Sequence, residues 1–197
     1  MAGERESLVA PSLNRLFHAM SEYDRGDALR IQHFTKVWTY ARMIGLGEGL
    51  DVNTQNTLEA AAILHDIGIH KAERGFSSSS GSLQEKLGPA EAVKLMTDLG
   101  FDREMIRRVS YLIGHHHTYT EIDGIDYQIL VEADFLVNIL EDRLSEEAAE
   151  HTFETIFKTE TGKKLFRDMY PDHERFVCSD GIERSLYDIF MDGTSVF

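Results

Sequence analysis

The feature that most constrains this fold is an ionisable pair, His65 and Asp66, that follows the apolar run 60–64. An imidazole or a carboxylate that loses its water inside a protein must be paired, hydrogen-bonded or bound to metal. A divalent cation would satisfy both groups at once. Because two ligands do not fill a coordination sphere, further His, Asp or Glu residues are expected on other apolar helix faces.

Two of the expected residues continue apolar helical stripes elsewhere in the chain. His33 follows Leu29 by four residues and precedes Val37 by four, a spacing that puts all three on one helix face. Asp134 follows Leu130 by four residues on a second apolar face. Both side chains are therefore predicted to point into the core.

A run of three histidines supplies the remaining candidates. His116 continues the stripe of Val109 and Ile113, and His115 precedes it. Neighbouring residues on a helix are about 100° apart, so both need not face one ion. His117 is interpreted as a solvated residue.

The order of these groups resembles the HD superfamily of metal-dependent phosphohydrolases, over roughly residues 29–140. The resemblance implies one divalent ion bound by His33, His65, Asp66 and Asp134. Ile67 and Gly68 extend the doublet to the HDIG form, and His115-His116 resembles the extra histidines of two-metal members. A second ion is compatible with this pattern.

The chain departs from the branch of the superfamily that acts on cyclic dinucleotides. That branch has a Lys three residues after its Asp and a later Gly-Tyr-Pro motif, whereas position 69 here is Ile and the tripeptide is absent. Its activity is not assigned. Where that branch has a histidine before an Ile-Gly-Ala turn, the nearest segment here offers Glu85.

Composition limits the classes of partner. The chain has 197 residues, which fits one domain, with an HD core at about 29–140 and a helical extension at about 145–197. A formal charge of -14 disfavours nucleic-acid polymers and anionic membranes, whereas small phosphorylated molecules remain suitable partners. One cysteine, Cys178, and the lack of an apolar leader or membrane span predict a cytoplasmic protein. A homodimer is left open.

The periodicity predicts an all-α, single-domain helical bundle, because no alternating strand pattern persists and the chain has 3 prolines. Expected helices span 12–21, 27–45, 54–66, 89–99, 103–115, 126–141, 145–157, 162–169 and 182–190. The expected N-caps are Asn53, Asp102 and Ser145, and Pro89 suits a first helical turn. The expected helix stops are Gly45, Gly68 and Gly100.

The segment 74–82 is rich in Gly and Ser, and two interpretations of it are open. It is either a lid that orders over the site when substrate binds or a solvated surface loop.

Two imidazoles and two carboxylates leave coordination positions for water and a phosphoryl oxygen, which is a hydrolytic arrangement. Mixed N and O ligands suit Mn, Fe, Co, Ni or Zn. Asp66 and Lys71 are the candidate catalytic residues. Lys71 and Arg74, which follow the doublet closely together with His70, are the candidate phosphate contacts.

Three functions follow from this pattern. The leading hypothesis is hydrolysis of a small phosphate ester by a metal-activated water, and the resemblance implies a nucleotide as the substrate, because many members of the superfamily act on nucleotides. Relatives with the same helices and extra histidines hold two irons and oxidise their substrates with dioxygen, so a di-iron oxygenase is the second. The third is a noncatalytic module in which metal staples the bundle or senses a ligand.

Overall fold

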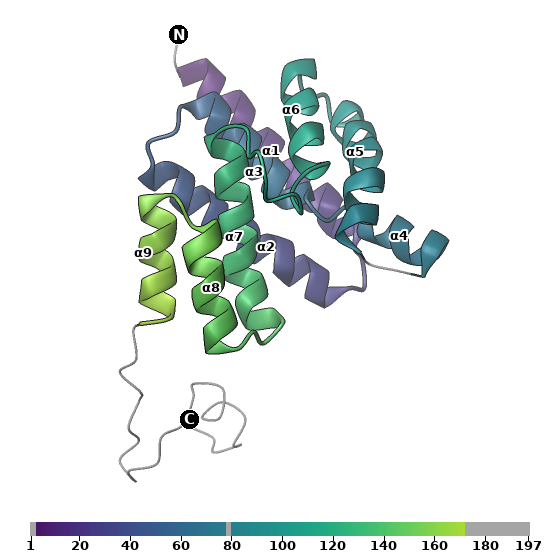
Figure 1. The fold of residues 1–197 in the computed structure, drawn as a ribbon. Helices are drawn as coiled ribbons and strands as arrows, with labels where there is room; N and C mark the ends of the chain where they lie inside the picture. Colours follow the sequence, from purple (N-terminus) through teal and green to yellow (C-terminus); the bar gives the residue numbers. More distant parts are fainter. Residues whose placement is uncertain (1–2, 78–79, 172–197) are drawn as a thin grey trace, which may run out of the picture. The chain divides into compact units, whose positions relative to one another are not determined.

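The computed structural model describes residues 3–77 and 80–171, which form nine helices and no strand (Figure 1). The expected all-α class is confirmed. The helices are α1 (Gly3–Tyr23), α2 (Ala28–Gly47), α3 (Val52–Leu64), α4 (Ile69–Phe76), α5 (Gly81–Asp98), α6 (Arg103–Ile113), α7 (Ile125–Glu141), α8 (Glu146–Ile156) and α9 (Glu160–Met169). The helix expected at 182–190 lies outside the described residues.

The chain divides into two units after residue 163, and the described residues of the first are 3–77 and 80–163. The first contains α1 to α8 and every candidate site residue. The single-domain assignment stays a prediction. Among the described residues, no helix combines the length and the apolar character needed to cross a bilayer.

Side-chain caps fix the starts of several helices. Asp102 and Ser145 accept hydrogen bonds from the first-turn N–H groups of α6 and α8, which confirms two predicted N-caps. The third was wrong: Asn53 lies inside α3, and Asp51 caps this helix instead. Both residues can cap, and Asp51 is the one whose extended backbone places its carboxylate over the N–H groups of Asn53 and Thr54.

The region after the doublet is more helical than expected. α4 includes the first residues of the Gly- and Ser-rich segment 74–82. α5 begins eight residues before Pro89, so this proline lies inside a helix and not in its first turn. The residues between Gly81 and Pro89 include Leu, Gln, Glu and Lys, which favour helix. Only residues 77–80 separate the two helices.

Two of the three predicted glycine stops were wrong. Gly100 has φ +82 just after α5 and ends it as expected. Gly45 lies inside α2, and a Cβ there would meet the side chain of Gln55. Gly68 has φ −73, and a Cβ on it would come within 2.7 Å of the backbone N of Gly88. Close approach to α5, not a left-handed turn, requires the glycine.

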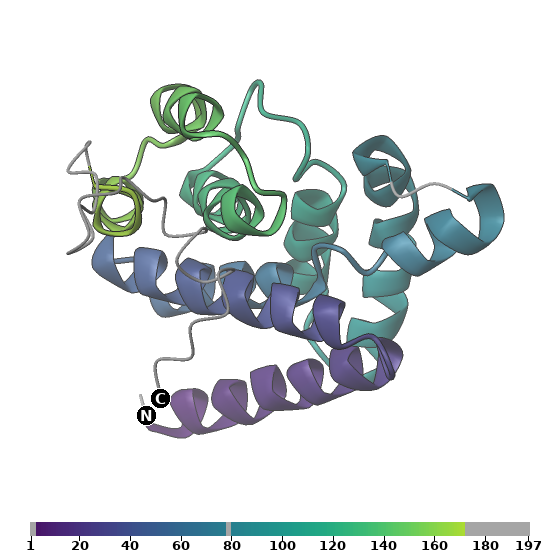
Figure 2. The same ribbon diagram turned by 90° about the horizontal axis from the view of Figure 1, so that it is seen from below.

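The core of the first unit lies where α2, α3 and α7 pack together. Residues 60–64 at the end of α3 are completely buried, and α7 buries side chains on all sides. α1 packs against α3, and its Phe17 also contacts Phe34 and Trp38 of α2. α5 packs against α6 (Figure 2). The doublet therefore follows the most buried helix end of the unit.

Candidate metal centre

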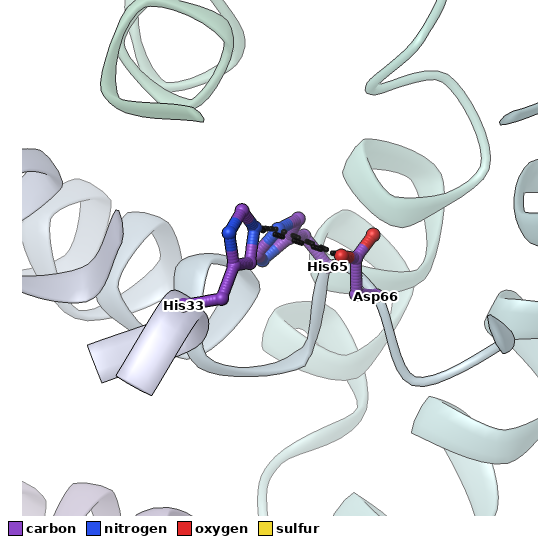
Figure 3. Close-up of side chains that lie close together, drawn as sticks. All are labelled: His33, His65 and Asp66. Atoms are coloured by element: carbon purple, nitrogen blue, oxygen red, sulfur yellow. Dashed lines mark hydrogen bonds and ion pairs between the residues drawn. The ribbon is translucent and has the colours of Figure 1, made fainter. Parts of the chain in front are cut away.

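Three helices bring His33, His65, Asp66 and Asp134 to one point. His33 comes from α2 and Asp134 from α7, whereas His65 and Asp66 form the turn that ends α3. Figure 3 shows His33 facing the doublet, with its Nε2 3.1 Å from His65 Nε2 and 3.6 Å from Asp66 Oδ2. Asp134 Oδ1 lies 3.4 Å from His33 Nε2 and 3.6 Å from His65 Nε2.

These separations fit ligand atoms arranged around one cation. Atoms about 2.1 Å from an ion lie roughly 3.0 Å apart at a right angle and roughly 3.4 Å apart at the tetrahedral angle. The distances from His33 Nε2 and His65 Nε2 to each other and to the two carboxylates run from 3.1 to 3.6 Å. Asp134 Oδ1 is also buried with no hydrogen-bond partner among the described residues. A divalent ion would supply the missing partner.

The ring orientations of two buried histidines point to the same conclusion. His65 Nδ1 lies 2.9 Å from the carbonyl oxygen of Ala62, and His116 Nδ1 lies 2.8 Å from that of Ile113. A carbonyl can only accept, so each Nδ1 carries the proton and donates it. In the neutral rings, both Nε2 atoms then present lone pairs toward the centre, which is the form that binds metal.

Glu141 orients the third imidazole. Its Oε2 lies 2.8 Å from His33 Nδ1, and its Oε1 pairs with Lys36. A carboxylate on the outer nitrogen fixes the ring and raises its basicity as a ligand. The sequence interpretation missed Glu141, although it lies seven residues after Asp134 and so shares its side of α7.

The charges of the cluster are strongly coupled. Burial by itself lowers the pKa of His65, but the carboxylates of Asp66 and Asp134 outweigh it and raise this pKa to about 9. Burial likewise opposes the ionisation of Asp66, yet His65 and His116 hold the pKa of its carboxyl well below the usual range. Without metal, protons on the imidazoles balance the carboxylates.

A second group of ligand atoms shares Asp66 with the first. Asp66, His116 and His117 can each offer a ligand atom within 4.8 Å of the others, and Asp66 Oδ1 lies 3.4 Å from His116 Nε2. The Nε2 atoms of His116 and His117 are buried without hydrogen-bond partners in the described structure. Burial and the charge of His116 lower the pKa of His117 to about 4. Asp66 could therefore bridge two ions.

His115 and His117 have the opposite orientations to those expected from the sequence. His115 turns away from Asp66: its ring stacks on Tyr111 with centroids 4.2 Å apart, and its Nδ1 lies 2.7 Å from the Tyr111 carbonyl oxygen. His117, expected to be solvated, faces the cluster instead. α6 ends at Ile113, so the helical spacing used to orient the histidines does not continue through them.

Two side chains from distant parts of the sequence fix the backbone of residues 115–118. The hydroxyl of Tyr127 shares its one proton between the carbonyl oxygens of His115 and Thr118. Glu85 accepts hydrogen bonds at 3.0 Å from both the His117 N–H and the Thr118 hydroxyl. Glu85 thus supports the second group of ligands through the backbone.

The centre opens into a cavity of about 390 Å³. Its lining includes the ligands His33, Asp66, His117 and Asp134. Leu29, predicted on the buried stripe of His33, is 82% exposed and lines this cavity. Lys71 and Arg74 are not among the lining residues, and Lys71 pairs with Glu91.

Fold and centre together define a class: an all-α protein in which helix ends and faces converge on a His/Asp site for divalent metal. The family model for the HD domain matches residues 30–159. The chain belongs to the HD domain family, whose members bind divalent metals.

One solved structure is similar to this chain over most of its length. A predicted HD superfamily hydrolase from an uncultured Thermotogales bacterium is 26% identical, with a TM-score of 0.59 over 80% of this chain and 84% of that chain. No curated protein matched. The family and this neighbour support a metal-dependent hydrolase.

Proposed function

We propose that this protein is a metal-dependent phosphohydrolase that hydrolyses a small phosphate ester, with a nucleotide as the leading substrate class. The carrying observation is a cluster of ligand atoms spaced for a cation, one side of which opens into a cavity of about 390 Å³. Such a cavity lies within the usual range for small-molecule sites, about 300–1,000 Å³.

The side chains divide the work of such a centre. When bound, a divalent ion lowers the pKa of water toward neutrality and polarises a phosphoryl group. His33, His65 and Asp134 would hold the ion, and the burial of His65 and Asp134 makes the site rigid before substrate arrives. Asp66, with one oxygen toward each group of ligands, would hold both ions in register.

The electrostatics of the chain favour a small substrate over a polymer. A formal charge of -14 repels nucleic acids at long range. Inside the cavity, bound cations reverse the local field, so a compact phosphate ester can still bind. Lys71 and Arg74 remain proposed phosphate contacts, and each would have to turn toward the cavity to reach it.

Turnover of a substrate panel tests this function. Protein loaded with Mn²⁺ should release phosphate or pyrophosphate from at least one member of a panel of nucleotides and phosphomonoesters. Asp66→Ala should abolish release, because both groups of ligands lose a shared carboxylate. Asp98→Ala, an exposed residue at the end of α5, is the matched control and should keep full activity. Absence of turnover by metal-loaded wild type across the panel would reject the proposal.

The bridging position of Asp66 also suits a di-iron oxygenase, the second candidate. Here the readout is spectroscopic: as-purified protein would carry iron, with visible absorption that changes on reduction or on exposure to oxygen. A colourless protein that hydrolyses esters with Mn²⁺ supports the phosphohydrolase.

A further inference from the structure

A guanidinium shares the cavity with the metal centre. Arg30 precedes His33 by three residues on α2, so the two side chains lie on one face of the helix and both line the cavity. Among the residues that line this cavity, Arg30 is the one with a permanent positive charge. The other charged lining residues, apart from histidines, are the acids Asp24, Asp66, Asp134, Glu141 and Asp142.

A chain of hydrogen bonds from α2, α4 and the turn between α1 and α2 fixes this guanidinium. Arg30 Nη1 lies 2.8 Å from Asp27 Oδ2 and 3.1 Å from His70 Nδ1, and its Nη2 lies 2.6 Å from Glu73 Oε1. Arg30 can only donate, so His70 Nδ1 accepts. His70 Nε2 then carries the proton in the neutral ring and donates to Asp24 Oδ1 at 2.9 Å.

The Asp24–His70 pair is built into the fold. The side chain of Asp24 is 1% exposed in the turn that follows α1, and His70 belongs to the first turn of α4, four residues after Asp66. This pair therefore ties the position of the guanidinium to the elements that carry Asp66.

Two donors of Arg30 are left over by this network. A guanidinium has five N–H groups, and Asp27, His70 and Glu73 account for three of them. The Nε–H and one Nη2–H remain, on the edge of the planar fork that binds two phosphate oxygens at once. An anion in a cavity lined by five acids needs such a cation.

We propose that Arg30 binds a phosphate oxygen of the substrate and that Asp24 and His70 are positioning residues for its guanidinium. This assignment rests on the proposed function for the substrate class. It puts the principal phosphate contact on α2, ahead of the first metal ligand, and not at Lys71 after the doublet.

Binding of inorganic phosphate to Mn²⁺-loaded protein, followed by isothermal titration, tests the proposal without turnover. Arg30→Gln should weaken phosphate binding by about tenfold or more, because it removes a charge-assisted pair of hydrogen bonds. Arg25→Gln, which removes an exposed arginine paired with Glu22, is the matched control and should bind phosphate as wild type does. Metal content and melting temperature of each variant are measured alongside.

The positioning role has its own readout. His70→Gln should weaken phosphate binding by about threefold to tenfold at unchanged metal content, since the guanidinium loses one of its fixed partners.

Wild-type phosphate affinity in folded, metal-loaded Arg30→Gln would overturn the contact. Should that variant not fold, Arg30→Lys keeps the charge and the helix, and wild-type affinity in this variant would likewise overturn the paired contact.

The outcome separates this assignment from the proposed function. Loss of phosphate binding in Arg30→Gln, in a protein that hydrolyses no ester, would keep the anion site and reject the phosphohydrolase. With an ester that is hydrolysed, KM should rise by about tenfold in Arg30→Gln while kcat changes little, as for a contact made equally in the ground and transition states. An unchanged KM would reject the contact and leave the phosphohydrolase standing.

Discussion

His65 is the residue at which proton and metal compete. Its Nδ1–H is committed to the carbonyl oxygen of Ala62, so only Nε2 can take either of them. In the metal-free protein, Asp66 and Asp134 raise the pKa of His65 to about 9 against the effect of burial. Metal must displace that proton at neutral pH.

The metal-free protein should therefore lose stability as pH rises. The pKa of His65 rises from 6.5 in the unfolded chain to about 9 in the folded protein. Protonation of His65 therefore stabilises the folded state in full below pH 6.5, and this contribution is lost above about pH 9. This group contributes on the order of 3 kcal/mol across the interval. Urea unfolding of chelator-treated protein at intervals between pH 6 and 10 measures the loss.

Metal binding should show the opposite dependence, with affinity that increases toward pH 9 as the proton becomes easier to remove. His65→Gln, which cannot be protonated in this range, is the control for the metal-free protein and should flatten its stability profile. Stability of the metal-free wild type that does not fall between pH 6.5 and 9 would contradict the assigned protonation.

Gly68 is the second residue with a defined steric role. A Cβ there would lie 2.7 Å from Gly88 N and 2.8 Å from the Gln84 carbonyl oxygen, and backbone atoms cannot move aside cheaply. Gly68→Ala should therefore destabilise by about 1–3 kcal/mol through overpacking. Gly75→Ala is the matched control, because a Cβ at that position in α4 meets nothing within 4 Å. Thermal unfolding of both variants tests the assignment, and equal melting temperatures would remove the stated reason for this glycine.

At the scale of elements, α7 carries both a metal ligand and a structural clamp. Glu132, two residues before Asp134, is completely buried and accepts hydrogen bonds from the backbone N–H groups of Lys158 and Thr159. It also accepts from the side chain of Gln128. The clamp fixes the connection that follows α8.

Glu132→Ala should destabilise the protein by about 2–4 kcal/mol, since it leaves two backbone donors without their acceptor. Glu154→Ala, an exposed position in α8, removes the same group and should have little effect. Chemical denaturation gives both values. A Glu132→Ala variant as stable as Glu154→Ala would show that the buried bonds contribute nothing net.

The sequence predicted the bounds of most helices closely. The expected bounds of α2, α3, α6, α7, α8 and α9 lie within two residues of the observed ones. α4 escaped prediction because it is short and rich in charge, and most of its side chains are exposed. Helices of this kind depend on tertiary contacts such as the Arg30–Glu73 pair, which no local pattern reveals.

The candidate site was predictable to the same degree as its helices. His33 and Asp134 could be oriented because they continue stripes on long helices. His115 and His117 could not, because their positions depend on Tyr127 and Glu85, which belong to other elements. Arg30 and Glu141 were missed for a related reason, since polar residues on a helix reveal their partners only once the helices are packed.

At the scale of the whole first unit, the fold places negative charges together at a point where cations can compensate them. Asp66 and Asp134 share one small volume with four imidazoles close to the meeting point of α2, α3 and α7. Three buried polar atoms in that volume have no hydrogen-bond partner in the described structure: His116 Nε2, His117 Nε2 and Asp134 Oδ1. Cations would give these three atoms the partners that they lack.

Metal stoichiometry is the most direct test of that claim. Purified protein is dialysed against Mn²⁺, freed of excess ion, and analysed for bound metal per chain by mass spectrometry. Wild type and Asp98→Ala should retain at least one ion per chain and Asp66→Ala almost none, although all three remain folded by circular dichroism. Wild type without bound ion, or Asp66→Ala with the wild-type content, would contradict the account.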